Sequence, residues 1–189
     1  MIDIPLPERV FAADVYLRRF QPSDHAALLE YHADPEVVRL LPWPVRTPAQ
    51  VQSALDKDIN EFKFEEEGDF RVWALIRKED EHLIGEIVVF YRSAEHQHAE
   101  LGYVINPAFA GLGYMTQGCK VVIDALFATG LFHRVFARLD ARNERSEALL
   151  IRLGMRKEGH QIEDDLFKGE WTDTIIYATL QSEWKNKSL

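Results

Sequence analysis

A loop with two glycines, set between an alternating segment and a helical one, constrains this chain more than any other feature. The loop covers residues 106–116 and reads Asn106-Pro107-Ala108-Phe109-Ala110-Gly111-Leu112-Gly113-Tyr114-Met115-Thr116. Glycines let a backbone approach a ligand closely, and the first N–H groups of a helix attract phosphate. Because the loop has no Lys or Arg, main-chain donors would have to hold such a ligand. The pattern favours an anion site, although a glycine pair before a helix is also typical of a plain turn.

The same residues exclude two nucleotide-binding motifs. A P-loop requires Gly-Lys-Ser/Thr, which the loop lacks, and a dinucleotide fingerprint requires a third glycine where Thr116 stands. The chain also does not open with the parallel strand-helix-strand unit that such a fingerprint needs. We therefore expect neither ATP nor a nicotinamide cofactor.

Apolar residues around the loop repeat with the period of β-strands in seven segments. These segments are 15–20, 70–76, 83–91, 98–105, 135–139, 165–171 and 174–180. Short turns separate the second, third and fourth of them, which predicts an antiparallel meander. The expected fold class is α/β (α+β), with a mixed, mostly antiparallel central sheet of about seven strands flanked by helices.

Capping residues mark the helices between these strands. The sequence predicts helix starts at Ser23, Asp34, Thr47 and Asn143, and helix ends at Gly130 and Gly154. Thr47 is the clearest start, because Pro48 occupies the first helical position and Gln50 completes a capping box. A further helix is expected directly after the glycine loop, with its apolar residues at helical spacing.

The composition limits the number of domains, the kinds of partner and the cellular location that can be expected. With 189 residues, 47% of them apolar, the chain can bury one sizeable core, and we expect a single domain over residues 1–189. A net charge of −9 argues against a nucleic-acid partner, which needs clustered Lys and Arg. The start lacks a basic region followed by an apolar run, and no apolar run is long enough for a membrane span. A cytoplasmic protein without membrane association is expected.

Three stretches of the chain carry the most specific motifs. They are 98–107 (His98-Ala99-Glu100-Leu101-Gly102-Tyr103-Val104-Ile105-Asn106-Pro107), 111–114 (Gly-Leu-Gly-Tyr), and 143–155, from Asn143-Glu144-Arg145-Ser146 to Leu153-Gly154-Met155. Together they resemble the GNAT superfamily, in particular its ribosomal-protein N-terminal acetyltransferase (RimJ/RimL-like) branch. The resemblance spans nearly the whole chain with the elements in the right order. It implies a sheet splayed in the middle, acetyl-CoA or another acyl-CoA as co-substrate, and direct acyl transfer to an amine.

The resemblance also implies a cofactor site. Pantetheine would lie along the backbone at Tyr103, Val104 and Ile105. The pyrophosphate would meet N–H groups of the loop, namely those of Gly111, Leu112, Gly113, Tyr114, Met115 and Thr116. The chain departs from the family pattern at Ala110 and Met115, where the family has a Gln or Arg and a smaller residue.

The helix that begins near Asn143 is expected to approach the cofactor sulfur. Many relatives place a tyrosine on this helix, where this chain has Leu150. The branch it resembles uses a serine one turn after the asparagine, which corresponds to Ser146. Ser146 could therefore protonate the leaving thiolate, although a first-turn serine is also typical of local backbone bonding. Asn143 is expected to cap the helix and to contact the cofactor.

Acyl transfer requires a neutral amine, so a base is expected near the cleft. Glu100 is the preferred candidate, because it shares one strand face with His98 and Val104 and could reach the cleft directly or through a water. Glu86 and His98 are the second and third candidates. A solvated strand glutamate is the plain alternative for Glu100.

Other chemical groups have simpler explanations. Cys119 lies on the apolar stripe of its helix and is expected to be a buried structural thiol. His96 and His98 lack a third ligand of fitting spacing, so no metal site is expected. Tyr31 and Trp43 either line the acceptor cleft or pack helices.

The acceptor is expected to be an amine, either a protein N-terminus or a small molecule, and the protein is expected to be a monomer or homodimer. The alternative is a catalytically impaired module that binds CoA or another protein.

Overall fold

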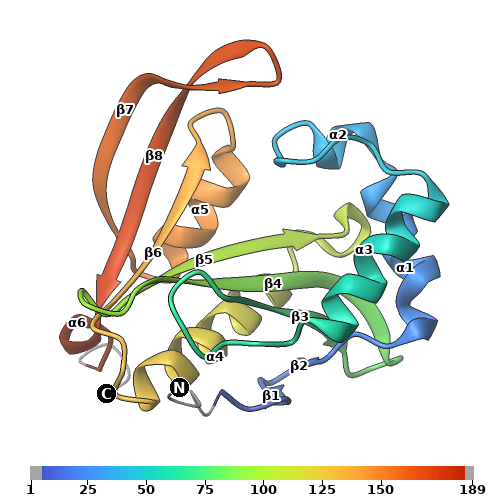
Figure 1. Ribbon diagram of the computed structural model, residues 1–189, viewed down its shortest axis with the longest axis horizontal. Helices are drawn as coiled ribbons and strands as arrows, with labels where there is room; N and C mark the ends of the chain where they lie inside the picture. The colour runs from blue at the N-terminus through green and yellow to red at the C-terminus, as the bar shows by residue number, and fades with distance from the viewer. Residues whose placement is uncertain (1–5, 186–189) are drawn as a thin grey trace.

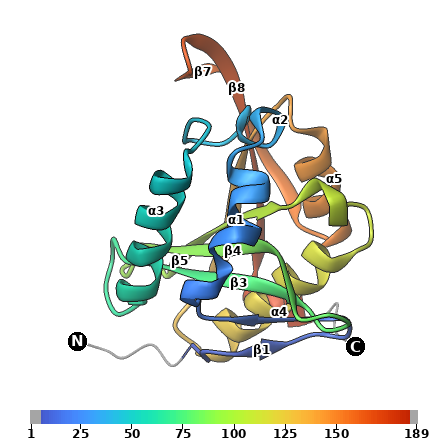
Figure 2. The ribbon, with the colours of Figure 1, turned by 90° about the vertical axis from the view of Figure 1, so that its right-hand side faces the viewer.

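One eight-stranded sheet runs through the protein, with helices on both of its faces (Figures 1 and 2). The computed structural model describes residues 6–185. Its strands are β1 (Val10–Phe11), β2 (Val15–Arg18), β3 (Phe70–Arg77), β4 (His82–Ser93), β5 (His98–Ile105), β6 (Arg134–Asp140), β7 (Arg156–Phe167) and β8 (Glu170–Leu180), in the spatial order β1-β2-β3-β4-β5-β6-β8-β7. All neighbouring pairs are antiparallel except β5 and β6. The expected mixed and mostly antiparallel α/β fold is confirmed.

The helices divide between the two faces. They are α1 (His25–His32), α2 (Pro35–Val38), α3 (Pro48–Asn60), α4 (Tyr114–Ala128), α5 (Glu144–Arg152) and α6 (Gln181–Lys185), with short 3-10 turns at Pro22–Asp24 and Pro107–Phe109. Figure 2 shows α1 and α3 on one face and α4 on the other. Within residues 6–185, no helix has both the length and the apolar content that a membrane span requires.

Strand alternation builds two apolar clusters, one on each face of the sheet. Trp73, Leu75 and Ile87 point to the α4 side, where they pack with the apolar stripe of that helix. Ala74 and Val104 point to the α1 and α3 side. The two faces therefore receive alternate residues of the same strands, as the period of two requires.

The predicted capping chemistry is present at α3. The Gln50 N–H donates to Thr47 Oγ1 at 3.3 Å, and the Thr47 N–H donates to Gln50 Oε1 at 2.9 Å.

The first predicted helix start needs a correction. Residues 22–24 form a 3-10 turn and α1 begins at His25, with Asp24 rather than Ser23 at the N-cap. The Asp24 carboxylate forms an ion pair with Arg18, with 2.7 Å between Arg18 Nη1 and Asp24 Oδ2.

The sheet splays between β5 and β6. Only three residue pairs join these parallel strands, from His98 with Arg134 to Glu100 with Phe136. Beyond Glu100 the two strands separate. In the described part of the chain, the β6-facing edge of β5 therefore has no strand partner over residues 101–105. The opening expected from the resemblance is therefore present, with its vertex at Glu100.

Two strand predictions need correction. The sheet has eight strands rather than about seven, because β1 pairs with β2 through Val10 and Leu17. The closing hairpin also begins earlier than predicted, since β7 covers Arg156–Phe167 and the expected strand 165–171 crosses the turn at Lys168-Gly169. Nearly every residue of β7 is exposed, so its sequence lacks the alternation that would reveal a strand.

Candidate active site

The glycine loop forms an open cradle at the start of α4. Gly111 and Gly113 have φ values of 80° and 82°, a region that favours glycine. A Cβ added at either would meet no atom of the described residues within 4 Å. The first helical hydrogen bond joins the Gln117 N–H to Gly113 O at 3.0 Å. The N–H groups of residues 114–116 precede this bond, so they are available to a ligand. Open space and free donors together fit a phosphate group.

Met115 does not obstruct this cradle. Its side chain is only 4% exposed and belongs to the apolar core on the α4 side. The Met115 Cε atom would lie 3.2 Å from a Cβ at Gly85, which shows that the side chain points toward β4. The bulk of this residue is thus accommodated in the core, while its backbone N–H stays at the start of the helix.

The open edge of β5 leads directly to the cradle. Tyr103, Val104 and Ile105 lie on the stretch that has no partner on the β6 side. Asn106 fixes the turn that follows: its N–H donates to Ile84 O at 2.8 Å, and its Oδ1 accepts from the Ala108 N–H at 3.1 Å. An extended ligand can therefore pair with the backbone of β5 and continue into the loop.

Ser146 and Tyr103 meet across the splay. Their hydroxyl groups lie 2.7 Å apart, and Ser146 O accepts a second bond from Tyr103 Oη at 3.2 Å. The Ser146 N–H donates to Asn143 Oδ1 at 3.1 Å, so Asn143 caps α5 as predicted. Burial raises the pKa of Tyr103 well above its ordinary value, which keeps the phenol protonated. Sequence reasoning placed Ser146 near this region but missed the contact with Tyr103.

Glu100 lies at the vertex of the splay and is 8% exposed. Its Oε2 accepts from Arg92 Nε at 2.6 Å, and its Oε1 accepts from Arg138 Nε at 3.2 Å. The two guanidinium groups come from β4 and β6 and hold the carboxylate in one orientation. Sequence reasoning missed both, since only the pairing of β5 with its two neighbouring strands brings them together.

The other two base candidates lie on the same face of the sheet. Glu86 is opposite Val104 and is also 8% exposed, with its Oε1 at 3.4 Å from His32 Nε2. His98 starts β5, and burial together with the charge of Arg134 lowers its pKa. The three candidates thus form a row along β4 and β5, with Glu100 between the other two.

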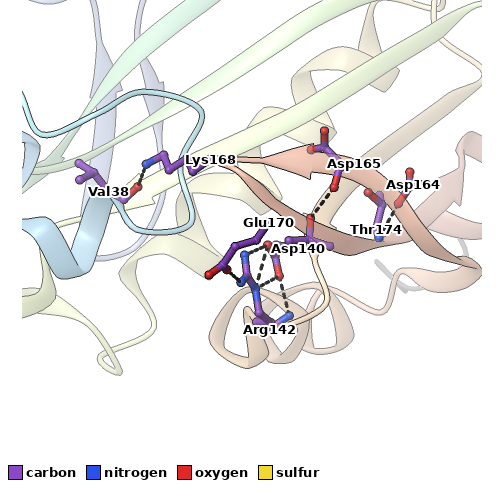
Figure 3. A network of polar contacts seen from close by, with 9 residues as sticks. Val38, Asp140, Arg142, Asp164, Asp165, Lys168, Glu170 and Thr174 are labelled. Carbon is purple, nitrogen blue, oxygen red and sulfur yellow. Dashed lines mark hydrogen bonds and ion pairs between the residues drawn. The ribbon is translucent and has the colours of Figure 1, made fainter.

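The β7–β8 hairpin is hydrogen-bonded to the end of α2 and to the segment that follows it. Lys168 Nζ donates to Val38 O at 2.6 Å and to Trp43 O at 2.9 Å. Figure 3 shows the bond to Val38, and it also shows Arg142 joining Asp140 to Glu170, which directly follows the hairpin turn. These two hydrogen bonds from Lys168 fix the position of the loop that carries Trp43. No periodic pattern in the sequence could have revealed them, because the two partners are carbonyl groups.

Cys119 has no role in this arrangement. It is fully buried, and burial raises its pKa well above the ordinary value. A buried protonated thiol is a poor nucleophile, in agreement with the structural role expected for it.

Asp58, on α3, is a carboxylate whose protonation is coupled to folding. Burial first, and then the charge of Glu86, raises its pKa from 3.8 to about 7. Since folding favours the protonated form, the contribution of Asp58 to stability is greatest below about pH 4 and is lost as the pH rises to about 7. Asp58→Asn should therefore raise the free energy of unfolding at about pH 8 by on the order of 3 kcal/mol, and hardly change it near pH 4. Urea unfolding measures both values, and an equal effect at both would contradict the coupling.

The chain is similar to known acetyltransferases over most of its length. A family model described as an acetyltransferase (GNAT) domain matches residues 14–156. The uncharacterized N-acetyltransferase YnaD of Bacillus subtilis (strain 168) is 30% identical over 170 residues, which cover 89% of this chain and 94% of that protein. The [ribosomal protein uS5]-alanine N-acetyltransferase of Escherichia coli (strain K12) is 30% identical over 176 residues, which cover 89% of this chain and 88% of that enzyme.

A solved structure shares the whole architecture. The crystal structure of a GNAT-family acetyltransferase from Bacillus anthracis superposes with a TM-score of 0.83 at 26% identity, covering 93% of this chain and 99% of that one. The family match, the relatives and the solved structure all point to the same acetyltransferase family. This chain therefore belongs to the GNAT acetyltransferase family, in its RimJ/RimL-like branch, and is an N-acetyltransferase that uses acetyl-CoA as co-substrate.

Proposed function

We propose that the protein transfers an acetyl group directly from acetyl-CoA to a primary amine, either a protein N-terminus or a small molecule. The observation that carries this proposal is the continuous path from the open edge of β5 to the cradle at Gly111 and Gly113. The vertex residue Glu100 and the Tyr103–Ser146 pair lie along the same path. The name of the relative that acts on the uS5 alanine supports a protein N-terminus as one acceptor.

The chain offers the co-substrate a backbone site rather than a charged one. The N–H groups of residues 111–116 would hold the pyrophosphate, and the backbone at Tyr103, Val104 and Ile105 would pair with the pantetheine. Asn143 and Ser146 would lie beside its thiol end. Acetyl-CoA supplies the activated acetyl thioester when it is bound there.

Glu100 and Ser146 have complementary roles in this proposal. Glu100 takes the proton that the ammonium group must lose before the nitrogen can attack. The Ser146 hydroxyl, which contacts Tyr103, donates a hydrogen bond to the leaving sulfur. As the C–N bond forms and the C–S bond breaks, the nitrogen loses a second proton and the sulfur gains one. The products are the amide, free thiol and one proton released to solvent.

Steady-state kinetics tests direct transfer. Initial rates are measured while acetyl-CoA and an amine are both varied, with release of the free thiol as the readout. Direct transfer predicts intersecting lines in double-reciprocal plots, because both substrates must be bound together. Cys119→Ala should show the same pattern with a similar rate, since the buried thiol takes no part. Parallel lines would indicate an acetylated enzyme and would overturn the mechanism.

A further inference from the structure

Three phenylalanine rings lie in a row across the sheet, and the proposed base lies in the same row. Phe70 pairs with Phe90 between β3 and β4. Phe90 in turn pairs with Glu100, and Glu100 pairs with Phe136 of β6. Directly paired residues of neighbouring strands point to the same face of a sheet. Glu100 therefore has a phenylalanine on each side, one from each neighbouring strand.

The two rings beside Glu100 belong to neither apolar core. Their chain neighbours Val89 and Val135 are fully buried in the cluster on the α4 side. Because strand residues alternate, Phe90 and Phe136 point to the α1 and α3 side. Both are half-buried, and within residues 6–185 neither is part of the apolar cluster on that side. Apolar rings that stay partly exposed next to a reaction centre indicate a surface for a ligand.

The acceptor approaches this same face under the proposed mechanism. Tyr103, whose hydroxyl contacts Ser146 beside the proposed position of the thiol, packs against the cluster on the α4 side. Glu100 points to the opposite face, because Ala99 and Leu101 on either side of it belong to that cluster. The amine must therefore reach Glu100 from the α1 and α3 side, while the acetyl group arrives through the splay.

The two rings border the place where the amine must lie. The Cε2 atom of Phe90 would be 3.9 Å from a Cβ at Gly102, the next residue after Glu100 on the same face. The Phe90 ring thus extends toward the open edge of β5. Phe136 lies across the row, with 6.4 Å between its ring centroid and that of His98. An amine that reaches Glu100 consequently places its nearest substituent against one or both rings.

Cations next to the rings determine which substituent this surface favours. Arg92 Cζ lies 4.4 Å from the ring centroid of Phe90, and Arg134 Cζ lies 4.6 Å from that of Phe136. A planar guanidinium stacks well on aromatic faces, so a further aromatic ring can pack beside these pairs. A second ammonium group on the acceptor would instead be repelled by both arginines. The surface therefore favours an aromatic substituent and disfavours a cationic one.

We propose that Phe90 and Phe136 bind an aromatic group that lies next to the reacting amine of the acceptor, with the guanidinium groups of Arg92 and Arg134 completing the surface. The preferred acceptor is then a primary amine whose aromatic ring is attached two carbons from the nitrogen. An arylalkylamine and a polypeptide that begins with an aromatic residue share this chemistry. The inference rests on the proposed acetyl transfer and adds the chemical class of the acceptor.

Matched acceptors test this preference. The value of kcat/KM is measured for phenethylamine and propylamine, and for otherwise identical tetrapeptides that begin with Phe, Ala or Lys. In at least one set, the aromatic acceptor should exceed the aliphatic one by at least about tenfold, which corresponds to about 1.4 kcal/mol. The set that shows the preference distinguishes a small molecule from a protein N-terminus, and the Lys peptide should be the poorest of the three. Equal values for aromatic and aliphatic acceptors in both sets would overturn the inference and leave the proposed function intact.

Two ring variants separate recognition from general packing. Phe136→Ala should reduce the aromatic preference at least about fivefold, mainly through KM, because Arg92 still holds Glu100. Phe70→Ala is the matched control. Phe70 lies in the same row, 6.0 Å from Phe90 between ring centroids, but one strand further from Glu100. Its aromatic preference should stay within about twofold of the natural protein. Equal losses in the two variants would show that the rings act only by packing, and would overturn the inference.

A binding experiment keeps the inference testable if no amine is turned over. Phenethylamine is titrated into the protein in the presence of CoA, with propylamine as the matched probe and Phe136→Ala as the control variant. Tighter binding of phenethylamine that disappears in Phe136→Ala supports the aromatic surface whatever the rate of transfer. Equal binding of the two amines, or a difference that persists in Phe136→Ala, would overturn it. Absence of turnover for every acceptor would instead count against the proposed function.

Discussion

Glu100→Gln should lower kcat by between about 100-fold and 1,000-fold while the dissociation constant for acetyl-CoA stays within about twofold. Glutamine preserves the shape of the side chain and can still accept from one guanidinium, but it cannot take a proton from the amine. Glu100 lies at the vertex of the splay, where β5 leaves β6, and the proposed cofactor contacts begin three residues further along. The loss should therefore fall on the chemical step. Rates at saturating acetyl-CoA, together with calorimetry for binding, measure the two effects separately.

Arg138→Gln is the matched control for this variant. It breaks the same ion pair, whose atoms are 3.2 Å apart, but it leaves the carboxylate in place with Arg92 as its partner. Its turnover should remain within about fivefold of the natural protein, because the Arg138 side chain is 55% exposed and Arg92 still holds the carboxylate. A large loss in Arg138→Gln with a small one in Glu100→Gln would move the chemistry from the carboxylate to the guanidinium. Unchanged turnover in Glu100→Gln would remove Glu100 from the mechanism, and Glu86 would become the candidate to test.

Gly113→Val should weaken acetyl-CoA binding by at least about 100-fold, which corresponds to about 2.7 kcal/mol. The position has a φ of 82° and open space where a Cβ would be, directly before the first free N–H groups of α4. A valine there would fill the space proposed for the pyrophosphate. It would also strain the backbone, because a β-branched residue is disfavoured in the left-handed region.

Gly130→Val separates the two effects. Gly130 follows the other end of α4, with a φ of 72° and no atom within 4 Å of the position that a Cβ would take. Both variants should lose a similar amount of stability, of about 1 to 2 kcal/mol, in thermal or urea unfolding. Only Gly113→Val should lose affinity for acetyl-CoA. Equal affinities in the two variants would mean that the pyrophosphate lies elsewhere.

The parts of the fold that could be predicted are those whose signals are local. Thr47 and Gln50 form their capping box within four residues, and Asn143 caps α5 through the Ser146 N–H. The strands of the meander bury apolar residues on both faces, so they are visible in the sequence as strongly apolar segments. The hairpin turn at Lys168-Gly169 escapes prediction because β7 is exposed along nearly its whole length, and solvent imposes no period on a strand.

The contacts that define the candidate site depend on tertiary pairing and could not be predicted. The place of Glu100 on a strand face is visible in the sequence, but its two arginines come from neighbouring strands. Likewise, the sequence puts Met115 beside the phosphate, and only the packing of α4 against β4 shows that its side chain enters the core. The buried position of His32 gives no signal either, because its partners Arg46 and Glu86 lie far from it along the chain.

Calorimetric titration of the purified protein with acetyl-CoA, with ATP and NAD as controls at fixed salt, tests the central claim most directly. We expect saturable binding of acetyl-CoA with one site per chain, and no binding of the other two nucleotides. The three ligands share a pyrophosphate linkage within the nucleotide, so selectivity depends on the pantetheine arm and its pairing with the open edge of β5. A folded protein that fails to bind acetyl-CoA, or that binds all three ligands alike, would contradict the account.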